Sequence, residues 1–398
     1  MTSNKMKRER DYIMPKVIVS LTSYPKRIHT VYKVIESLWN QKKCADRIIL
    51  YLSIEEFPQK ASDLPKELVE MIEVNGFHIE WVEGNLKSHK KYYDALQQYE
   101  NDIVITVDDD IKYADTLISD LIESYERFPN AISARRARVI LKKEDSLEAY
   151  QEWDTYVERY ANLLRMDLCA IGVGGILYPP HSATKEWIDK EKIVRLADNQ
   201  DDLWLKCNEL MSGIPVTYVV PTQNDISVEG TQESALSLKN MCQGENDICI
   251  DKLCEYMRNN HSEIFNNWFA SLMTKEEFVL EKKGYYFSCM QKKFDAMDDI
   301  PIYLYGAGKK AEVILQILEE GQLLQRLEAI LVSDKQNNPD KLFGLEVKQL
   351  DEIDKENAFY VIYGVGKAYQ PEVENMLKDY QCNELQLDIA GIVRYYKK

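Results

Sequence analysis

Three consecutive aspartates, Asp108, Asp109 and Asp110, follow the apolar run 103–107. Adjacent carboxylates repel one another and aspartate is a poor strand former, so strand stability gives no reason for the cluster. Mg²⁺ and Mn²⁺ favour oxygen ligands and commonly take one or two protein carboxylates. In an extended segment Asp108 and Asp110 point to one side and Asp109 to the other. We therefore predict a metal site at Asp108 and Asp110; the alternative is a solvated turn whose Asp residues cap a helix beginning near Ala114.

Basic and hydroxyl side chains that suit a nucleotide diphosphate flank the acidic strand. The first strand ends in the loop 20–27, a Lys-rich stretch covers 87–91, and three arginines lie within 133–138. Arginine grips phosphate through two hydrogen bonds, and lysine adds a point charge. Each run alone is equally compatible with a solvated face, but their position around the acidic strand favours an anion site.

A second carboxylate pair, Asp201 and Asp202, opens a helical pattern, and a glycine-rich stretch at 172–175 precedes it. Glycines let the backbone approach a ligand closely, and a carboxylate opposite a metal suits a general base. The alternative is a helix N-terminus with acidic residues in its first turn.

Short apolar strands alternate with amphipathic helices from Lys16 to Val220, which predicts an α/β sheet. We expect strands at 17–21, 47–52, 77–82 and 103–107, and a helix at 30–39 whose apolar residues share one face. Three domains are predicted: an α/β domain over 14–221, a helical appendage or connector over 222–300, and a small Rossmann-like α/β domain over 301–398. The connector contains helical segments at 235–241, 248–257 and 264–273.

The C-terminal domain opens with a strand at 302–305, a glycine turn and a helix through Leu318. Its turn, Gly306-Ala307-Gly308-Lys309-Lys310-Ala311, has the spacing of a dinucleotide-binding turn, and a second Tyr-Gly-x-Gly-Lys turn stands at 363–367. Gly306, Gly308 and Ala311 therefore form a second candidate nucleotide site. Such turns also occur for packing alone, in which case the domain is a docking or assembly module.

The composition bounds the class of protein. The 398 residues carry a net charge of −16, which argues against nucleic acid as a partner. The eight cysteines form no CxxC pair, which fits scattered reduced thiols. Without an apolar window for a membrane span or a secretory signal, we expect a cytoplasmic protein. The basic residues Lys5, Lys7, Arg8 and Arg10 leave peripheral contact with the inner face of the cell membrane open.

Six ordered motifs between about 16 and 220 resemble bacterial GT-A-fold glycosyltransferases of capsule and O-antigen gene clusters. They are Ser-Leu-Thr-Ser-Tyr-Pro-x-Arg, Lys-Lys before an Ala-Leu helix, Thr-Val-Asp-Asp-Asp, Arg-Ala-x-x-Ile, Gly-Val-Gly-Gly-x-Leu-Tyr-Pro-Pro and Asp-Asp-x-Trp. The resemblance implies a hexosyltransferase with a nucleotide-diphosphate sugar donor, a saccharide or lipid-linked saccharide acceptor, and Mn²⁺ or Mg²⁺. The C-terminal unit resembles small Rossmann-like domains attached to sugar-nucleotide and capsule enzymes.

The resemblance also implies roles for single residues. Thr22, Tyr24 and Arg27 would line the nucleotide, and Lys91 and Arg136 would lie near the diphosphate or donor sugar. Asp109 would face the donor ribose or sugar, and Asp108 and Asp110 would bind the metal, with Asp110 the more direct ligand. Gly174 and Gly175 would frame the acceptor side. Asp202, or else Asp201, would be the base of an inverting displacement.

Three other functions compete with this interpretation. A sugar-nucleotide nucleotidyltransferase also needs nucleotide and metal, but it normally carries a glycine-rich loop after its first strand, and 22–27 contains no glycine. An NAD-linked oxidoreductase acting through 306–311 would leave the first 220 residues unexplained. A non-catalytic scaffold would tolerate alanine at all three aspartates.

Overall fold

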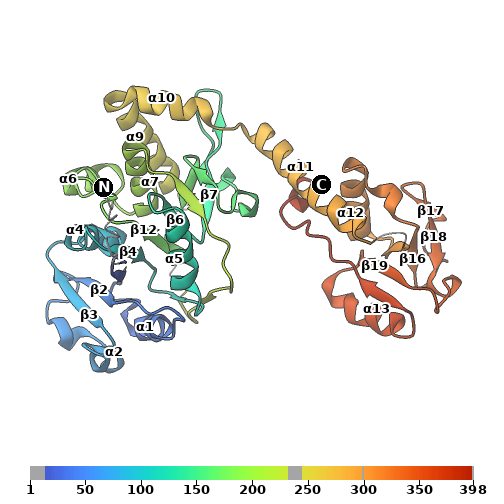
Figure 1. Cartoon of the computed structure of the whole chain (residues 1–398), viewed down its shortest axis with the longest axis horizontal. Helices are drawn as coiled ribbons and strands as arrows, with labels where there is room; N and C mark the ends of the chain where they lie inside the picture. The colour runs from blue at the N-terminus through green and yellow to red at the C-terminus, as the bar shows by residue number, and fades with distance from the viewer. Residues whose placement is uncertain (1–13, 232–243, 298–299, 397–398) are drawn as a thin grey trace, which may run out of the picture. The chain divides into compact units, whose positions relative to one another are not determined.

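The structure, a computed structural model, describes residues 14–231, 244–297 and 300–396. It divides the chain into two compact units, Met1–Lys275 and Glu276–Lys398, each with its own α/β fold (Figure 1). The predicted α/β class with a second, smaller α/β unit is confirmed. The expected connector is shared between the units: α9 (Glu245–Asn260) and α10 (Ser262–Ser271) belong to the first, and α11 (Lys275–Asp295) lies almost wholly in the second. The helix expected at 235–241 and the basic residues 5–10 lie outside the described residues.

The first unit is built on an eight-stranded sheet with the order β10-β13-β6-β12-β4-β1-β2-β3. Its four predicted strands are confirmed to within one residue: β1 (Val17–Thr22), β2 (Arg47–Ser53), β3 (Phe77–Val82) and β4 (Ile103–Thr106). These four run parallel, whereas β12 is antiparallel to both β4 and β6. The other four strands are β6 (Ile132–Ala134), β10 (Leu164–Arg165), β12 (Ile176–Tyr178) and β13 (Val216–Tyr218).

Three small strand pairs stand outside this sheet. They are β5 (Ile111–Lys112) with β14 (Ile226–Ser227), β7 (Ala137–Val139) with β11 (Leu168–Ala170), and β8 (Lys142–Lys143) with β9 (Ser146–Leu147). The pair β5–β14 matters for the site because β5 follows the acidic triplet directly.

Helices cover both faces of the large sheet. One face buries alternate β1 residues, Val17, Val19 and Leu21, against α1 (Val31–Trp39), α2 (Lys66–Met71) and α5 (Leu117–Arg127). Ser20 points to the other face, where its hydroxyl donates to the backbone of α3 (Lys90–Tyr93). The alternation of strand side chains thus assigns the helices to the two faces. Among the residues described, the other α-helices of this unit are α4 (Ala95–Gln98), α6 (Lys190–Leu196) and α7 (Asp201–Ser212), and α9 packs on α7 and α10.

The second unit has a six-stranded sheet with the order β17-β18-β16-β15-β19-β20, parallel except for the β17–β18 pair. The predicted strand and helix after it are confirmed as β15 (Ile302–Tyr305) and α12 (Lys309–Glu320). The second glycine turn follows β19 (Phe359–Tyr363) and leads towards α13 (Gln370–Leu377), so the predicted second βα unit is also present. The other strands are β16 (Ala329–Val332), β17 (Lys341–Leu342), β18 (Leu345–Gln349) and β20 (Cys382–Glu384).

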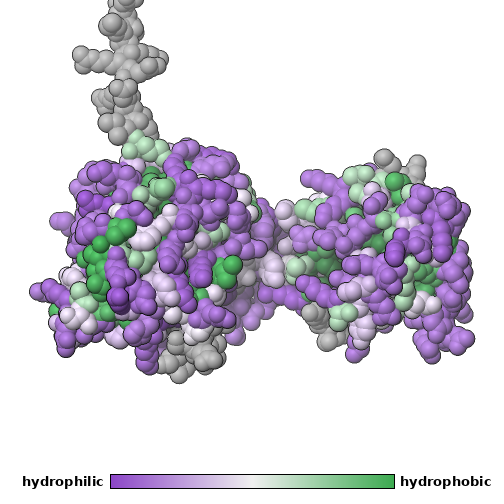
Figure 2. All heavy atoms as spheres, turned by 90° about the horizontal axis from the view of Figure 1, so that it is seen from below, coloured by the Kyte–Doolittle hydropathy of each residue, from purple (hydrophilic) through white to green (hydrophobic). Residues whose placement is uncertain are grey.

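The surface agrees with the polar composition. The face of each unit seen in Figure 2 is mostly hydrophilic, with apolar side chains in small groups. In the described part of the chain, no helix combines the length and the hydropathy that a membrane span needs.

Candidate functional site

The candidate site lies where several strands of the large sheet end. β1 and β4 are parallel neighbours, so the loops after Thr22 and Thr106 leave the sheet at the same edge. β12 is antiparallel to β4 and pairs Ile176 with Thr106, which brings the preceding turn, Gly172–Gly175, to that edge too. The carboxyl ends of parallel strands are where α/β sheets usually place their ligand sites.

The loop after β1 binds the acidic triplet through a buried arginine. The Arg27 guanidinium lies 2.9 Å from Asp109 Oδ1 and 3.1 Å from Asp110 Oδ2, and the Ser23 hydroxyl donates to Asp109 Oδ2 at 2.6 Å. Arg27, Asp109 and Asp110 are all buried. Asp109 is therefore engaged with the β1 loop, the side from which the donor nucleotide was expected to bind.

The chain turns at the triplet, which changes the predicted geometry. β4 ends at Thr106, and Asp109 and Asp110 lie in a turn. The alternation that would have put Asp108 and Asp110 on one side requires extended backbone, and that premise is wrong here. Asp109 and Asp110 share Arg27, whereas Asp108 faces a lysine.

Lys91 joins the triplet to the second carboxylate pair. Its ammonium lies 2.8 Å from Asp108 Oδ1 and 2.7 Å from Asp201 Oδ2, and its backbone carbonyl accepts the Ser20 hydroxyl at 2.5 Å. Burial alone would lower the pKa of Lys91, but the adjacent carboxylates raise it well above its usual value, so the side chain is cationic. A buried lysine between two aspartates fixes the distance between the acidic triplet and the start of α7.

Asp202 stands beside this bridge in the first turn of α7. Its Oδ1 accepts the Gly172 backbone N–H at 3.1 Å. Burial and the neighbouring carboxylates of Asp201 and Asp108 raise the pKa of Asp202 well above its usual range. For Asp201 burial acts in the same direction, but Lys91 and His89 outweigh it and lower the pKa. Two adjacent carboxyl groups thus differ in proton affinity, a difference that is common at functional sites.

Gly172 is the point at which these groups converge. A Cβ at this position would lie 2.6 Å from Lys91 Nζ and 3.3 Å from both Asp108 Oδ1 and Asp202 Oδ1. Only a residue without a side chain leaves the lysine and the two carboxylates in place. We call Asp108, Asp109, Asp110, Asp201 and Asp202 the acidic cluster.

Most of the residues predicted for the site lie close together in the structure. Arg27, Lys91 and the five aspartates contact one another directly or through Gly172. The Thr22 hydroxyl donates to the Tyr51 carbonyl at 2.8 Å, and the Tyr24 ring centre lies 5.8 Å from the Arg27 guanidinium carbon. Both remain candidates to line a nucleotide.

The predicted glycines and Arg136 lie at the turn before β12. A Cβ at Gly174 would lie 2.6 Å from the Arg136 Cβ, and Gly175 has a φ of +82° beside Leu117. These two glycines are explained by close packing and backbone conformation. Arg136 is exposed, whereas Arg135 is buried, so the sequence run 133–138 does not present its arginines to one surface.

Three residues of this site were not singled out from the sequence for the roles they take here. Gly172 was one of three glycines in a run, and Ser23 was one hydroxyl in a loop. Tyr113 accepts the Asp108 N–H at 2.8 Å and donates to the Val173 carbonyl at 3.3 Å. Tyr113 stands five residues after Asp108, close enough in the chain for its side chain to fold back over the turn. That spacing was the signal for its role that the sequence offered.

The glycine turn of the second unit is packed against the second turn. Gly306 has a φ of +107°, and a Cβ there would lie 2.8 Å from the Val365 side chain. A Cβ at Gly364 would lie 2.9 Å from the Ala311 Cβ. Packing between the two turns accounts for Gly306 and Ala311, whereas a Cβ at Gly308 would meet nothing within 4 Å.

Comparison with family models gave no match, and comparison with curated proteins gave no significant match. Solved structures gave weak likenesses. A putative glucose-1-phosphate thymidylyltransferase from Bacillus anthracis, in complex with a sucrose, is 10% identical with a TM-score of 0.37, over 57% of this chain and 95% of its own. A 4-diphosphocytidyl-2C-methyl-D-erythritol synthase is 12% identical with a TM-score of 0.35, over 56% of this chain and 96% of its own.

TarS from S. aureus is 11% identical with a TM-score of 0.36, over 77% of this chain and 52% of its own. This chain therefore spans about half the length of TarS in that match. Identities and TM-scores this low carry no conclusion about activity.

Proposed function

We propose that the first unit is a metal-dependent glycosyltransferase that moves a sugar from a nucleotide-diphosphate donor to a saccharide acceptor, with inversion at the sugar carbon. The observation that carries the proposal is the acidic cluster: a carboxylate turn at the end of β4 faces the Asp201–Asp202 pair across Gly172, with Lys91 between them. The extension to surface polysaccharide as the acceptor rests on the sequence resemblance.

The acidic cluster suits a divalent cation. Two basic side chains, Arg27 and Lys91, form ion pairs with this group of five carboxyl groups, so acidic groups outnumber basic ones in these contacts. Within the ranges that the structure describes, no three Asp, Glu, His or Cys side chains are grouped as an all-protein metal cage. Mg²⁺ and Mn²⁺ at nucleotide sites are commonly held by one or two carboxylates together with substrate phosphates. Asp108, whose side chain is 29% exposed, and Asp110 are the residues that would hold such a cation.

A metal bound there would neutralise charge on the departing nucleotide diphosphate. The protein's own groups supply the rest. Asp202, whose carboxylate accepts the Gly172 N–H at the start of α7, accepts the proton of the acceptor hydroxyl. Lys91 keeps Asp201 ionised beside it, and Arg27 holds the triplet against the β1 loop, where Thr22 and Tyr24 would border the nucleotide.

The nucleotide product distinguishes the proposed glycosyltransferase from a nucleotidyltransferase. The full chain is incubated with Mn²⁺ and UDP-, GDP- or CDP-linked sugars, with and without added pyrophosphate. A glycosyltransferase moves the sugar to the hydroxyl of an added saccharide acceptor, or more slowly to water, and releases the nucleoside diphosphate whether or not pyrophosphate is present. A nucleotidyltransferase instead joins pyrophosphate to the nucleotide and yields nucleoside triphosphate and sugar phosphate. Triphosphate formation that depends on pyrophosphate would overturn the proposal.

A further inference from the structure

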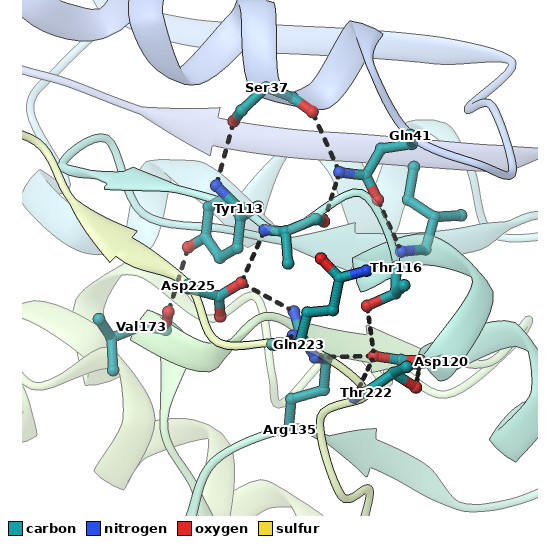
Figure 3. Close-up of polar contacts among 12 residues, drawn as sticks. Ser37, Gln41, Tyr113, Thr116, Asp120, Arg135, Val173, Thr222, Gln223 and Asp225 are labelled. Carbon is teal, nitrogen blue, oxygen red and sulfur yellow. Dashed lines mark hydrogen bonds and ion pairs between the residues drawn. The ribbon is translucent and has the colours of Figure 1, made fainter.

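Arg135 is a buried residue outside the acidic cluster, and it contacts a segment of the chain that lies beside the triplet. The Arg135 side chain is 0% exposed. Its guanidinium lies 3.2 Å from Asp225 Oδ1 and 3.4 Å from Asp120 Oδ2, and it donates to the Gln223 carbonyl at 2.9 Å (Figure 3). Arg135 follows β6, Asp120 is on α5, and Asp225 lies in residues 222–228, which we call the crossing segment. One guanidinium therefore ties three separate parts of the first unit together.

The crossing segment is fixed at both ends of its path. Thr222 donates its hydroxyl to Asp120 Oδ1 at 2.6 Å, and β14 pairs with β5 through Ile226 and Ser227. The Val228 side chain is buried in the core of the first unit. These contacts hold the segment against the residues that follow the acidic triplet.

One hydrogen bond joins the crossing segment to the triplet itself, and a second joins it to a residue shortly after the triplet. The Val228 N–H donates to the Asp110 carbonyl at 2.8 Å, and Asp225 Oδ1 accepts the Ala114 N–H at 2.9 Å. Between them, the Tyr113 backbone N–H donates to the Ser37 hydroxyl oxygen at 3.1 Å (Figure 3). The Tyr113 phenol oxygen accepts the Asp108 N–H. The backbone from Asp108 to Ala114 is thus held from outside by the crossing segment and by α1.

We infer that Arg135 and Asp225 are positioning residues: through the crossing segment they set the backbone of Asp110, and with it the carboxylate offered to a metal–nucleotide complex. The inference deepens the proposed function and rests on it for the ligand. The sequence run around Arg135 had indicated an anion site, but this guanidinium is occupied by Asp120 and Asp225 and acts through them. Outer groups of this kind hold the ligating residues and change metal affinity without touching the metal.

The test uses Asp225→Ala in the full chain, because Asp225 is less buried than Arg135 and its loss is more easily tolerated. Hydrogen–deuterium exchange of peptides covering 108–114 and 226–231 reports the anchoring, and titration with Mn²⁺ and UDP, GDP or CDP reports ligand affinity. We expect loss of protection in both peptides and an affinity for Mn²⁺–nucleotide lower by about tenfold. Asp225→Asn retains an oxygen for the Ala114 N–H and should restore part of both.

Ile122→Val on α5 serves as the matched control, since it removes a buried methyl group of the same core and leaves the polar contacts of the crossing segment intact. It should lower stability while protection of the two peptides and Mn²⁺–nucleotide affinity stay unchanged. Unchanged exchange in Asp225→Ala, or lost protection with unchanged affinity, would overturn the inference. If the wild-type chain binds none of the three nucleotides, the proposed function fails, and the exchange result alone decides whether Asp225 anchors the triplet backbone.

Discussion

At the level of single residues, two neighbouring aspartates at the start of α7 have different contacts. Lys91 contacts Asp201, whereas the Asp202 carboxylate accepts a backbone N–H and has a raised pKa. The sequence places both in the first turn of a helix, and only the contacts separate them. These different contacts lead to one prediction for Asp202 and another for Lys91.

Replacing Asp202 by Asn should remove the proton acceptor while keeping the size of the side chain and an oxygen for the Gly172 N–H. We expect kcat for sugar transfer to fall about 10²- to 10⁴-fold, with nucleotide affinity little changed. Steady-state kinetics and a binding titration of the same preparation separate the two effects. Asp198→Asn is the control, because that exposed aspartate pairs with Lys87 nearby and should leave kcat unaffected. Near-normal turnover in Asp202→Asn would show that this residue is not the base.

Replacing Lys91 by Met should leave Asp108 and Asp201 without their shared cation. Removing one partner of a buried ion pair typically costs about 3 kcal/mol of unfolding free energy, because the remaining charge is uncompensated. Denaturant unfolding of the full chain measures the change. Lys87→Met offers a close comparison: its pair with Asp198 is largely exposed and should be worth at most about 1 kcal/mol. Equal losses in the two variants would mean that Lys91 is not the buried bridge described above.

At the scale of elements, the turn before β12 brings the two carboxylate groups together. Alanine at Gly172 would place a methyl group 2.6 Å from Lys91 Nζ and force the lysine to move. Because moving the buried lysine weakens its two ion pairs, we expect some loss of unfolding free energy. We also expect a kcat/KM lower by at least about tenfold, since small misplacements of reacting groups are costly. Gly366→Ala, at φ −63° with only Tyr369 nearby, should leave kcat/KM at the wild-type value. A fully active Gly172→Ala variant would contradict the convergence of groups at this glycine.

The elements themselves were largely predictable from the sequence, and the contacts between them were predictable in part. Parallel strands bring their carboxyl ends to one edge, so the loops after β1 and β4 had to meet. The turn at Asp109–Asp110 was missed because the period-2 pattern says nothing about where a strand stops. The sequence also did not show which arginines in 133–138 are buried, because Arg135 pairs with Asp225, which lies 90 residues away in the chain. Periodicity reports local faces, whereas such pairings depend on the tertiary fold.

At the scale of the whole molecule, the two units contain separate sheets and separate cores. Gly306→Ala should strain a backbone at φ +107° and collide with Val365, so it should destabilise the second unit. We expect the unfolding of this unit at a lower temperature in calorimetry, with sugar transfer by the first unit unchanged below that temperature. The Gly366→Ala variant again serves as the control. Loss of sugar transfer in a folded Gly306→Ala protein would show that the second unit takes part in the reaction.

The proposed function requires the acidic cluster of the first unit to bind a nucleotide together with a divalent cation. The most direct measurement is the melting temperature of the full chain with UDP, GDP, CDP or NADH, each with and without Mn²⁺, for the wild type and Asp110→Ala. A ligand that binds only the folded state raises Tm, by about 5 °C at a hundredfold excess over its Kd. We predict a rise that needs Mn²⁺ and one of the three nucleotides and is lost in Asp110→Ala. A rise with NADH alone, or a nucleotide effect that survives in Asp110→Ala, would contradict the account.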